Sequence, residues 1–360
     1  FSRKAELYGE VHFLRAYYYF ELAKIFGEVP LFTESRLTAG DSSTLQRTPV
    51  SEVYAQIESD LKAAIAVLPA AKSLDGRATS FTAHALLGKV YLYQDKFDEA
   101  ASILEPLVGL YTLVPDLQDV FLTSGENGSE SVFEVQHSKN SNWWDWGFPQ
   151  GSEGSFGVIH HGIRGYNGSV YAQGWSFNVP TKDLYDAYSE GDSRRSVALL
   201  DIVAWAKADG AEYAEGYEHT GYFNHKYIPR AGATSAQGEL NYETNYRAIR
   251  YADVLLMAAE ANNRKTSADD VKAQNYLNQV RARAFGNDSK ASSSTGVVLT
   301  QEIWDERRLE LAMEGQRFFD LVRTGEAATK IEGFVSGKHE VFPIPQTEID
   351  ISGLTQNSGY

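Results

Sequence analysis

The stretch ATSFTAHALLGKVYLYQDKFDEAASILEPLV, residues 78–108, carries the strongest structural pattern in this sequence. Its small and apolar residues fall at the offsets of two antiparallel helices that pack on each other: Leu87, Gly88, Tyr91, Phe97 and Ala100. A glycine at position 88 allows the partner helix to approach closely, and Tyr91 fills the space beside it. Ala100 keeps the crossing distance short. We place the break between the two helices at Gln94–Lys96.

These offsets are those of a tetratricopeptide (TPR) helix pair, although Leu104 and Leu107 stand where that repeat usually has Phe and Ala. A second pair is predicted over Arg247–Asn263 and Asp269–Ala284. A single pair cannot bury its apolar face, so two or more pairs must stack. The predicted fold class is therefore mainly α, with TPR-like stacked helix pairs that form a scaffold.

Other segments also have helical periodicity. In Ala5–Phe26, apolar residues recur at spacings of three and four, namely Leu7, Val11, Leu14, Tyr18, Leu22 and Ile25. Gly27 and Pro30 end this helix. Further helices are predicted over Val50–Leu68, Leu299–Leu311 and Phe318–Val322.

Between residues 110 and 246 this periodicity disappears, and only Ser131–Gln136 alternates as a short strand does. A long insertion of this kind in a compact protein is usually functional, because a rigid scaffold holds loops that bind. We predict one domain over 1–360, with a helical scaffold in 1–109 and 247–325. Residues 110–246 form the loop-rich binding region, and residues 326–360 form an irregular tail.

Composition excludes several classes of function. The 360 residues are 43% hydrophobic and 22% charged, as in folded globular proteins. A net charge of −15 opposes binding of nucleic acid, which requires basic side chains. The absence of cysteine excludes disulfides and thiolate chemistry. The longest apolar run, near Val254–Ala259, is too short to span a bilayer. The chain starts at Phe1 without a targeting segment, which we interpret as the interior of a longer precursor.

Four segments, in order, resemble the signatures of one family. FLRAYYYF at 13–20, followed by FGEVPL at 26–31, resembles the first signature of SusD/RagB proteins. RYADVLL at 250–256 resembles their central helix. ERRLEL at 306–311 with EGQRFFDLVR at 314–323, and FPIPQTEI at 342–349, resemble their closing blocks. The resemblance covers nearly the whole chain.

The resemblance implies a TPR-based fold and a non-catalytic protein that binds a polysaccharide or oligosaccharide without a cofactor. It also implies a position on the outer face of the outer membrane, held by an N-terminal lipid whose cysteine is absent from this sequence. The partner it implies is a SusC-like TonB-dependent transporter, over which the binding protein acts as a lid.

The charged residues of these signatures have a structural interpretation. On helices with apolar faces such residues usually form ion pairs that hold the scaffold in register. This prediction applies to Arg15, Arg250, Asp253, Glu306, Arg307, Arg308 and Glu310.

The densest aromatic cluster is NWWDWGF at 142–148. Side chains alternate along a strand and fan by about 100° along a helix, so Trp143, Trp144 and Trp146 cannot all point inward. A sugar ring can pack its C–H face on an indole, while Asn142 and Asp145 can hydrogen-bond its hydroxyls. We therefore predict a ligand site here. The competing interpretations are a loop folded back onto the TPR layer or a surface packed against the transporter.

Further ligand-binding candidates in the same glycine-rich region are Arg164, Tyr166 and Trp175, although Trp175 also has apolar neighbours that suit a core. The adjacent His160 and His161 suggest a metal, but neighbours on a strand point apart and no motif places a third ligand. We predict no metal site.

The sequence leaves three functions open. A glycan receptor, with a neutral β-glucan such as laminarin as its ligand, agrees best with the tryptophan cluster. A peptide receptor is the alternative among relatives of the same family. A helical glycosidase is the third, since its two carboxylates are defined by spatial separation, which sequence does not reveal. Common catalytic motifs such as G-x-S-x-G, the P-loop and H-E-x-x-H are absent, so we predict no enzyme.

Overall fold

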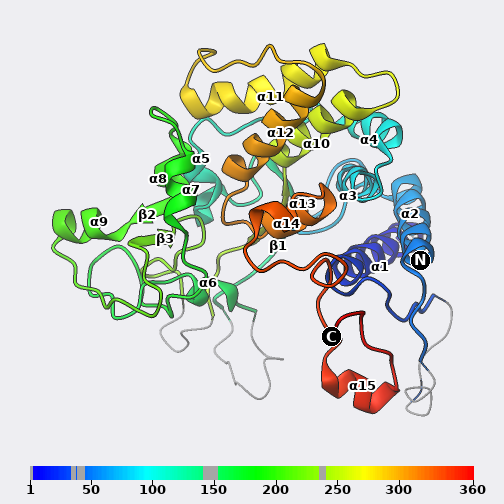
Figure 1. The fold of residues 1–360 in the computed structure, drawn as a ribbon, viewed down its shortest axis with the longest axis horizontal. Helices are drawn as coiled ribbons and strands as arrows, with labels where there is room; N and C mark the ends of the chain where they lie inside the picture. The colour runs from blue at the N-terminus through cyan, green and yellow to red at the C-terminus, as the bar shows by residue number, and fades with distance from the viewer. Residues whose placement is uncertain (1–2, 34–37, 39–44, 141–152, 235–240) are drawn as a thin grey trace. The chain divides into compact units, whose positions relative to one another are not determined.

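The first two helices begin and end close to the predicted positions. A computed structural model describes residues 3–33, 38, 45–140, 153–234 and 241–360 (Figure 1). Helix α1 spans Lys4–Phe26 and helix α2 spans Val50–Val67. Gly27 ends α1 with φ of 70°, a left-handed conformation that costs glycine little because it has no Cβ.

The described chain divides into two compact units, and the first comprises residues 1–73, 77–104 and 317–360. In this unit α1 packs on α2, α2 packs on α3 (Ser80–Leu92), and α3 packs on α4 (Phe97–Leu104). Figure 1 shows α1–α3 as neighbouring helices in chain order. A Cβ added at Gly88 would lie 2.5 Å from Leu104 Cγ, so the predicted close approach at Gly88 is confirmed.

The buried face of α1 differs from the one that the periodicity suggests. Val11, Leu14, Tyr18 and Leu22 are exposed. The buried residues of α1 are Gly9, Phe13, Ala16, Phe20 and Ala23. Both sets repeat at spacings of three and four, so spacing predicts the helix without selecting its inner face. Small residues on the inner side allow α2 to pack closely.

The C-terminal segment from residue 317 onward contains three short helices and is tied to the end of α1. These are α13 (Arg317–Arg323), α14 (Ala327–Lys330) and α15 (Gln346–Ser352). The Phe342 N–H donates to the Ile25 carbonyl at 2.7 Å, and the Asn357 amide donates to the Phe26 carbonyl at 3.1 Å. The proline-rich segment is thereby fixed on the first unit.

The second unit comprises residues 74–76 and 105–316, and its largest helices are α10 (Tyr251–Arg264), α11 (Asp270–Phe285) and α12 (Gly296–Glu310). Helix α10 packs against both α11 and α12. The prediction that a helix begins at Arg247 was wrong. Residues Tyr246–Arg250 form strand β4, which pairs antiparallel with β1 (Ser131–Val135). Arg250 is extended, with φ of −125°, and the helix begins after it.

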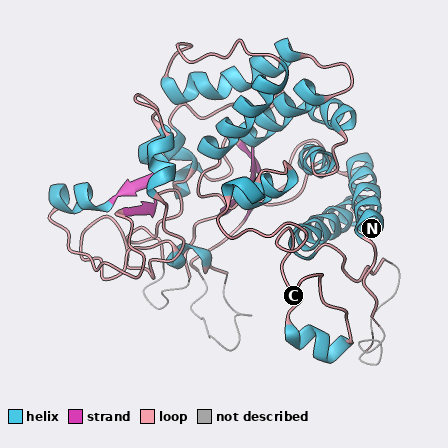
Figure 2. Ribbon diagram, viewed as in Figure 1, coloured by secondary structure: helices cyan, strands magenta, loops and turns pink. Residues whose placement is uncertain are grey.

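The rest of this unit is built from short elements, shown with many loops in Figure 2. Its helices are α5 (Leu117–Val120), α6 (Gly157–His160), α7 (Lys182–Ala187), α8 (Arg194–Ala198) and α9 (Ile202–Asp209), with 3-10 turns η2 (Glu105–Leu107) and η3 (Thr123–Gly125). Strands β2 (Leu199–Asp201) and β3 (Tyr222–Asn224) pair antiparallel. The predicted strand at Ser131 is confirmed, whereas these shorter elements have no clear periodicity.

The mainly helical fold with stacked helix pairs is thus confirmed. None of the helices formed by the described residues combines the length and the apolar character needed to cross a membrane. The assignment of one domain to the whole chain stays a prediction.

Candidate functional site

Five of the predicted site residues, Asn142, Trp143, Trp144, Asp145 and Trp146, lie outside the described residues. Their contact with a ligand stays a prediction. The other three, Arg164, Tyr166 and Trp175, belong to the second unit, and the structure places them differently from one another.

Trp175 belongs to an aromatic surface, which we call the platform, made by His160, Trp175 and Phe177. The ring centroids of His160 and Trp175 are 5.0 Å apart, and those of His160 and Phe177 are 5.9 Å apart with nearly parallel planes. Trp175 and Phe177 meet edge to face at 5.9 Å. Trp175 is half-buried, with its inner side on the core around Val158 and Ile159. Phe177 is 52% exposed.

The backbone fixes the platform. The Trp175 N–H donates to the Ile159 carbonyl at 3.0 Å, and the Phe177 N–H donates to the His160 carbonyl at 2.8 Å. Ser176 and Asn178, on either side of Phe177, have left-handed φ angles of 58° and 51°. Such conformations cost a non-glycine residue about 1–2 kcal/mol and persist where surrounding contacts impose them. The segment therefore holds the Phe177 ring toward solvent in a defined orientation.

Arg164 is exposed and lies beside the platform. Its Nη2 donates to the Trp175 carbonyl at 2.8 Å, and its backbone N–H donates to Ser176 Oγ at 3.0 Å. A guanidinium carries five donors, so Arg164 keeps others for a ligand. Arg164 and Trp175 are both predicted ligand-binding candidates, and the structure places them in contact.

Tyr166 has a different position. It is 3% exposed and lies in an aromatic core with Tyr171 and Trp205, and its hydroxyl accepts a hydrogen bond from Trp205 Nε1 at 3.3 Å. The structure does not place Tyr166 on the platform.

A cavity of about 180 Å³, which we call the α6 pocket, adjoins the same chain segments. His160 and Phe177 belong to the platform, whereas their neighbours His161 and Asn178 line the pocket. The Asn178 amide lies 3.4 Å from His161 Nδ1. Burial, with a smaller contribution from His160, lowers the pKa of His161 to about 4. Its ring is therefore neutral at physiological pH, with one donor and one acceptor.

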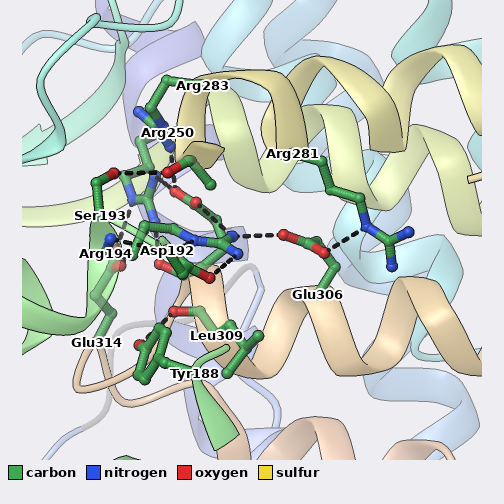
Figure 3. Close-up of polar contacts among 12 residues, drawn as sticks. Tyr188, Asp192, Ser193, Arg194, Arg250, Arg281, Arg283, Glu306, Leu309 and Glu314 are labelled. Atoms are coloured by element: carbon green, nitrogen blue, oxygen red, sulfur yellow. Dashed lines mark hydrogen bonds and ion pairs between the residues drawn. The ribbon is translucent and has the colours of Figure 1, made fainter. Parts of the chain in front are cut away.

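Glu314, which lines the pocket, belongs to a buried group of charged side chains that we call the ion network (Figure 3). Glu314 accepts hydrogen bonds from Arg250 Nε and Nη2, both at 2.8 Å, and from Lys226 Nζ at 2.7 Å. Burial raises the pKa of Glu314, but the charges of Arg250 and Lys226 outweigh it and keep that pKa below its ordinary value. Glu314 therefore stays ionised and fixed.

The ion network contains five cations and six anions. Its members are Arg194, Lys226, Arg250, Arg281, Arg283, Glu130, Asp192, Glu302, Glu306, Glu310 and Glu314. Figure 3 shows Arg194 pointing to Glu306, which Arg281 contacts from its other side. The predicted structural role of the signature residues is confirmed here, and also for Arg15 with Asp60, Arg307 with Asp253 and Arg308 with Asp183.

The rings of His160 and His161 face different neighbours. His160 faces Trp175 and Phe177, and His161 lies near Tyr227 with ring centroids 6.2 Å apart. Across the residues that the structure describes, no three His, Asp or Glu side chains converge as metal ligands would.

A second cavity, of about 490 Å³, lies in the first unit. It is lined mainly by apolar side chains of α1 and the C-terminal tail, among them Tyr18, Leu22, Phe26 and Ile344. Sugar hydroxyls need many polar partners, so this groove fits a glycan less well than the platform and the α6 pocket do.

Sequence reasoning missed Phe177, Asn178 and Thr244. Thr244 lines the α6 pocket two residues before β4. A lone Phe within a glycine-rich stretch carries no motif, and Thr244 lies 66 positions from Asn178. The alternation of aromatic and small polar residues in WSFN at 175–178 was the only available signal.

Comparison with known protein families gives two matches. The model of the "SusD family" matches residues 201–360. A model described as "Starch-binding associating with outer membrane" matches residues 1–92.

Individual proteins match along nearly the whole chain. A SusD-like protein of Formosa agariphila is 31% identical, over 98% of this chain and 74% of the relative. The solved structure of a laminarin binding SusD-like protein is 40% identical with a TM-score of 0.88, covering 99% of this chain and 80% of that one. Surface glycan-binding protein A from Bacteroides thetaiotaomicron, in complex with laminarihexaose, is 29% identical with a TM-score of 0.84, covering 98% and 78%.

Proposed function

The chain belongs to the SusD family, and from that premise we propose that it is a non-catalytic receptor that captures a polysaccharide at the cell surface. It delivers the glycan to a SusC-like TonB-dependent transporter, and a lipid anchors it to the outer membrane. The proposed ligand is a neutral β-glucan such as laminarin. The names of two similar solved structures support this choice, because they include laminarin and laminarihexaose.

The observation that carries the proposal is the fixed exposure of Phe177 beside Trp175. A pyranose ring presents a face of C–H groups, and a flat aromatic ring removes that face from water at little entropic cost. Because the backbone already holds Phe177 outward, ligand binding does not have to order it. Arg164 adds donors for hydroxyl oxygens at the edge of the platform. Contact of the tryptophans at 143, 144 and 146 with the ligand is also part of the proposal.

The arrangement of carboxylates supports a binding role over a hydrolytic one. Glycoside hydrolysis usually needs two carboxylates on opposite sides of the scissile bond, one of them protonated as an acid. Glu314 is the one carboxylate among the described residues that line the α6 pocket, and Arg250 and Lys226 keep it ionised. Such a group cannot donate a proton to a leaving oxygen.

Affinity electrophoresis and calorimetry with laminarin, other neutral glucans and charged polysaccharides test the proposal. We expect retention by a neutral glucan, no release of reducing ends, and a loss of about 1–2 kcal/mol in binding free energy for Phe177→Ala. Tyr8→Ala is the matched control, because Tyr8 is 57% exposed on α1. Unchanged affinity of Phe177→Ala for the glycan would mean that the platform does not bind the ligand. Retention by peptides alone would contradict the glycan assignment.

Delivery of the glycan to the transporter and the location of the protein are tested in intact cells. Protease treatment of intact cells should remove the protein if it faces outward. A deletion strain should lose growth on the bound glycan, and Phe177→Ala should restore growth less well than Tyr8→Ala. Full growth of the deletion strain would refute a role in uptake.

A further inference from the structure

We propose that the α6 pocket is a second subsite of the same receptor, which holds one neutral pyranose residue of the glycan whose neighbouring residues lie on the platform. The inference rests on the proposed glycan-binding function and adds a position and a charge preference to it.

The size of the pocket sets the size of its occupant. An engineered apolar cavity of about 150 Å³ holds a benzene ring, and the α6 pocket is about 180 Å³. One six-membered ring therefore fits, with its substituents toward the opening.

The polar groups of the pocket are of the kind that sugar hydroxyls need. Ser155, Thr244, Asn178 and His161 line this space. Among the described residues, Ser155 Oγ, Thr244 Oγ1, Asn178 Oδ1 and His161 Nε2 have no intramolecular hydrogen-bond partner. Asn245 also lines it, but its side chain is already bonded to Glu134, Gln136 and the His137 N–H. Hydroxyl, amide and neutral imidazole groups both donate and accept, so they match a sugar whose hydroxyls do the same.

The charge of the lining selects against acidic sugars. No lysine or arginine is among the described residues that line the pocket, and Glu314 is its one charged residue. The cations behind Glu314, Arg250 and Lys226, already donate to it and to the Glu310 carbonyl. A uronic acid or a sulfate ester would therefore find a carboxylate and no free cation. A neutral hexose meets no such repulsion.

The walls are held in place before any ligand arrives. Asn178 has a left-handed φ of 51°, and Met313, beside Glu314, has a left-handed φ of 66°. The Met313 carbonyl accepts a hydrogen bond from the buried Asn224 amide at 3.3 Å, and Glu314 is fixed by the ion network. A bulky residue in this conformation is uncommon and is often associated with a functional site. The same segments, His160–His161 and Phe177–Asn178, border both platform and pocket, so one glycan can reach both.

The test uses laminarihexaose and isothermal titration calorimetry on the whole chain. Thr244→Val removes one hydroxyl at nearly constant volume, and Asn178→Gly removes the amide while keeping the left-handed backbone accessible. Each should weaken binding about three- to tenfold, as expected for one hydrogen bond. Thr244→Trp fills the cavity and should weaken binding more than tenfold. Thr295→Val, at an exposed threonine whose side chain does not cap its helix, is the matched control and should bind as the wild type does.

The outcomes separate the two proposals. If Phe177→Ala weakens binding while Thr244→Val, Asn178→Gly and Thr244→Trp, all with wild-type thermal stability, bind equally well, the subsite is wrong and the receptor proposal stands. If Thr244→Trp does not fold, the other two variants decide. Tighter binding of a uronic or sulfated oligosaccharide than of laminarihexaose would overturn the charge preference. If the wild-type chain binds no laminarihexaose, both the β-glucan assignment and this inference fail.

Discussion

Replacing Glu310 by Gln tests how the ion network stabilises the second unit. Glu310 is fully buried and accepts hydrogen bonds from Arg250 Nη1 at 2.5 Å, Arg283 Nη2 at 2.6 Å and Arg194 Nη1 at 3.2 Å. Burial raises the pKa of Glu310, but these three cations outweigh it and hold that pKa far below its usual range. The amide of Gln has almost the same shape and no charge. Arg194, Arg250 and Arg283 then each lose an anionic partner, so their positive charge is less well compensated away from water.

Removing one partner of a buried ion pair costs about 3–5 kcal/mol, most of it from the charge left behind. We expect Glu310→Gln to lose that much free energy of unfolding in urea denaturation followed by circular dichroism. Glu105→Gln is the control, because Glu105 is 47% exposed and pairs with Lys272 at 2.9 Å. The control should lose less than about 1 kcal/mol. Equal losses in the two variants, or a loss below about 1 kcal/mol for Glu310→Gln, would refute the reasoning.

Three further predictions concern stability. Burial lowers the pKa of His225 to about 4, below its value near 6.5 in the unfolded chain. Between these pH values the unfolded chain binds more protons, so the free energy of unfolding should fall as the pH drops from about 6.5 to about 4. His225→Gln should make this fall smaller in urea titrations at a series of pH values. Gly88→Ala puts a Cβ against Leu104. We expect the free energy of unfolding to fall by about 1–3 kcal/mol, seen as a lower melting temperature. An unchanged melting temperature would mean that α3 and α4 separate easily. Tyr188→Phe removes a buried 2.8 Å hydrogen bond to the Leu309 carbonyl and should cost about 1 kcal/mol in urea; a more stable variant would contradict it.

Much of the fold was accessible from sequence because helices have a short period. The spacing in Lys4–Phe26 and the small residues near Gly88 predicted helices that the structure contains. The strand before α10 was missed, because Arg247–Arg250 continues an apolar pattern and its extended shape depends on pairing with β1, more than a hundred positions earlier. Long-range pairing of this kind leaves no local signal.

The candidate site was less accessible. The predicted candidates Arg164 and Trp175 are in contact, since both lie in the glycine-rich stretch and the contact is local, while their binding of a ligand stays a prediction. Tyr166 has the same sequence surroundings, yet it packs on Tyr171 in the core. Asn178 and Thr244 come together with His161 through long-range folding of the backbone that single residues do not predict. A residue type indicates what a side chain can do, whereas its direction is decided by tertiary packing.

The ion network also bears on how the second unit assembles. Its members come from positions 130, 192–194, 226, 250, 281–283 and 302–314, and Arg250 lies 120 positions from its partner Glu130. An intermediate that docks α10 and α12 before residues 192–194 arrive would bury carboxylates with too few counter-charges. Such partly assembled states are high in energy, so the unit should form and open as a whole, through a slow step set by loop closure over long distances. Transient exposure of one segment to a protease should then be rare.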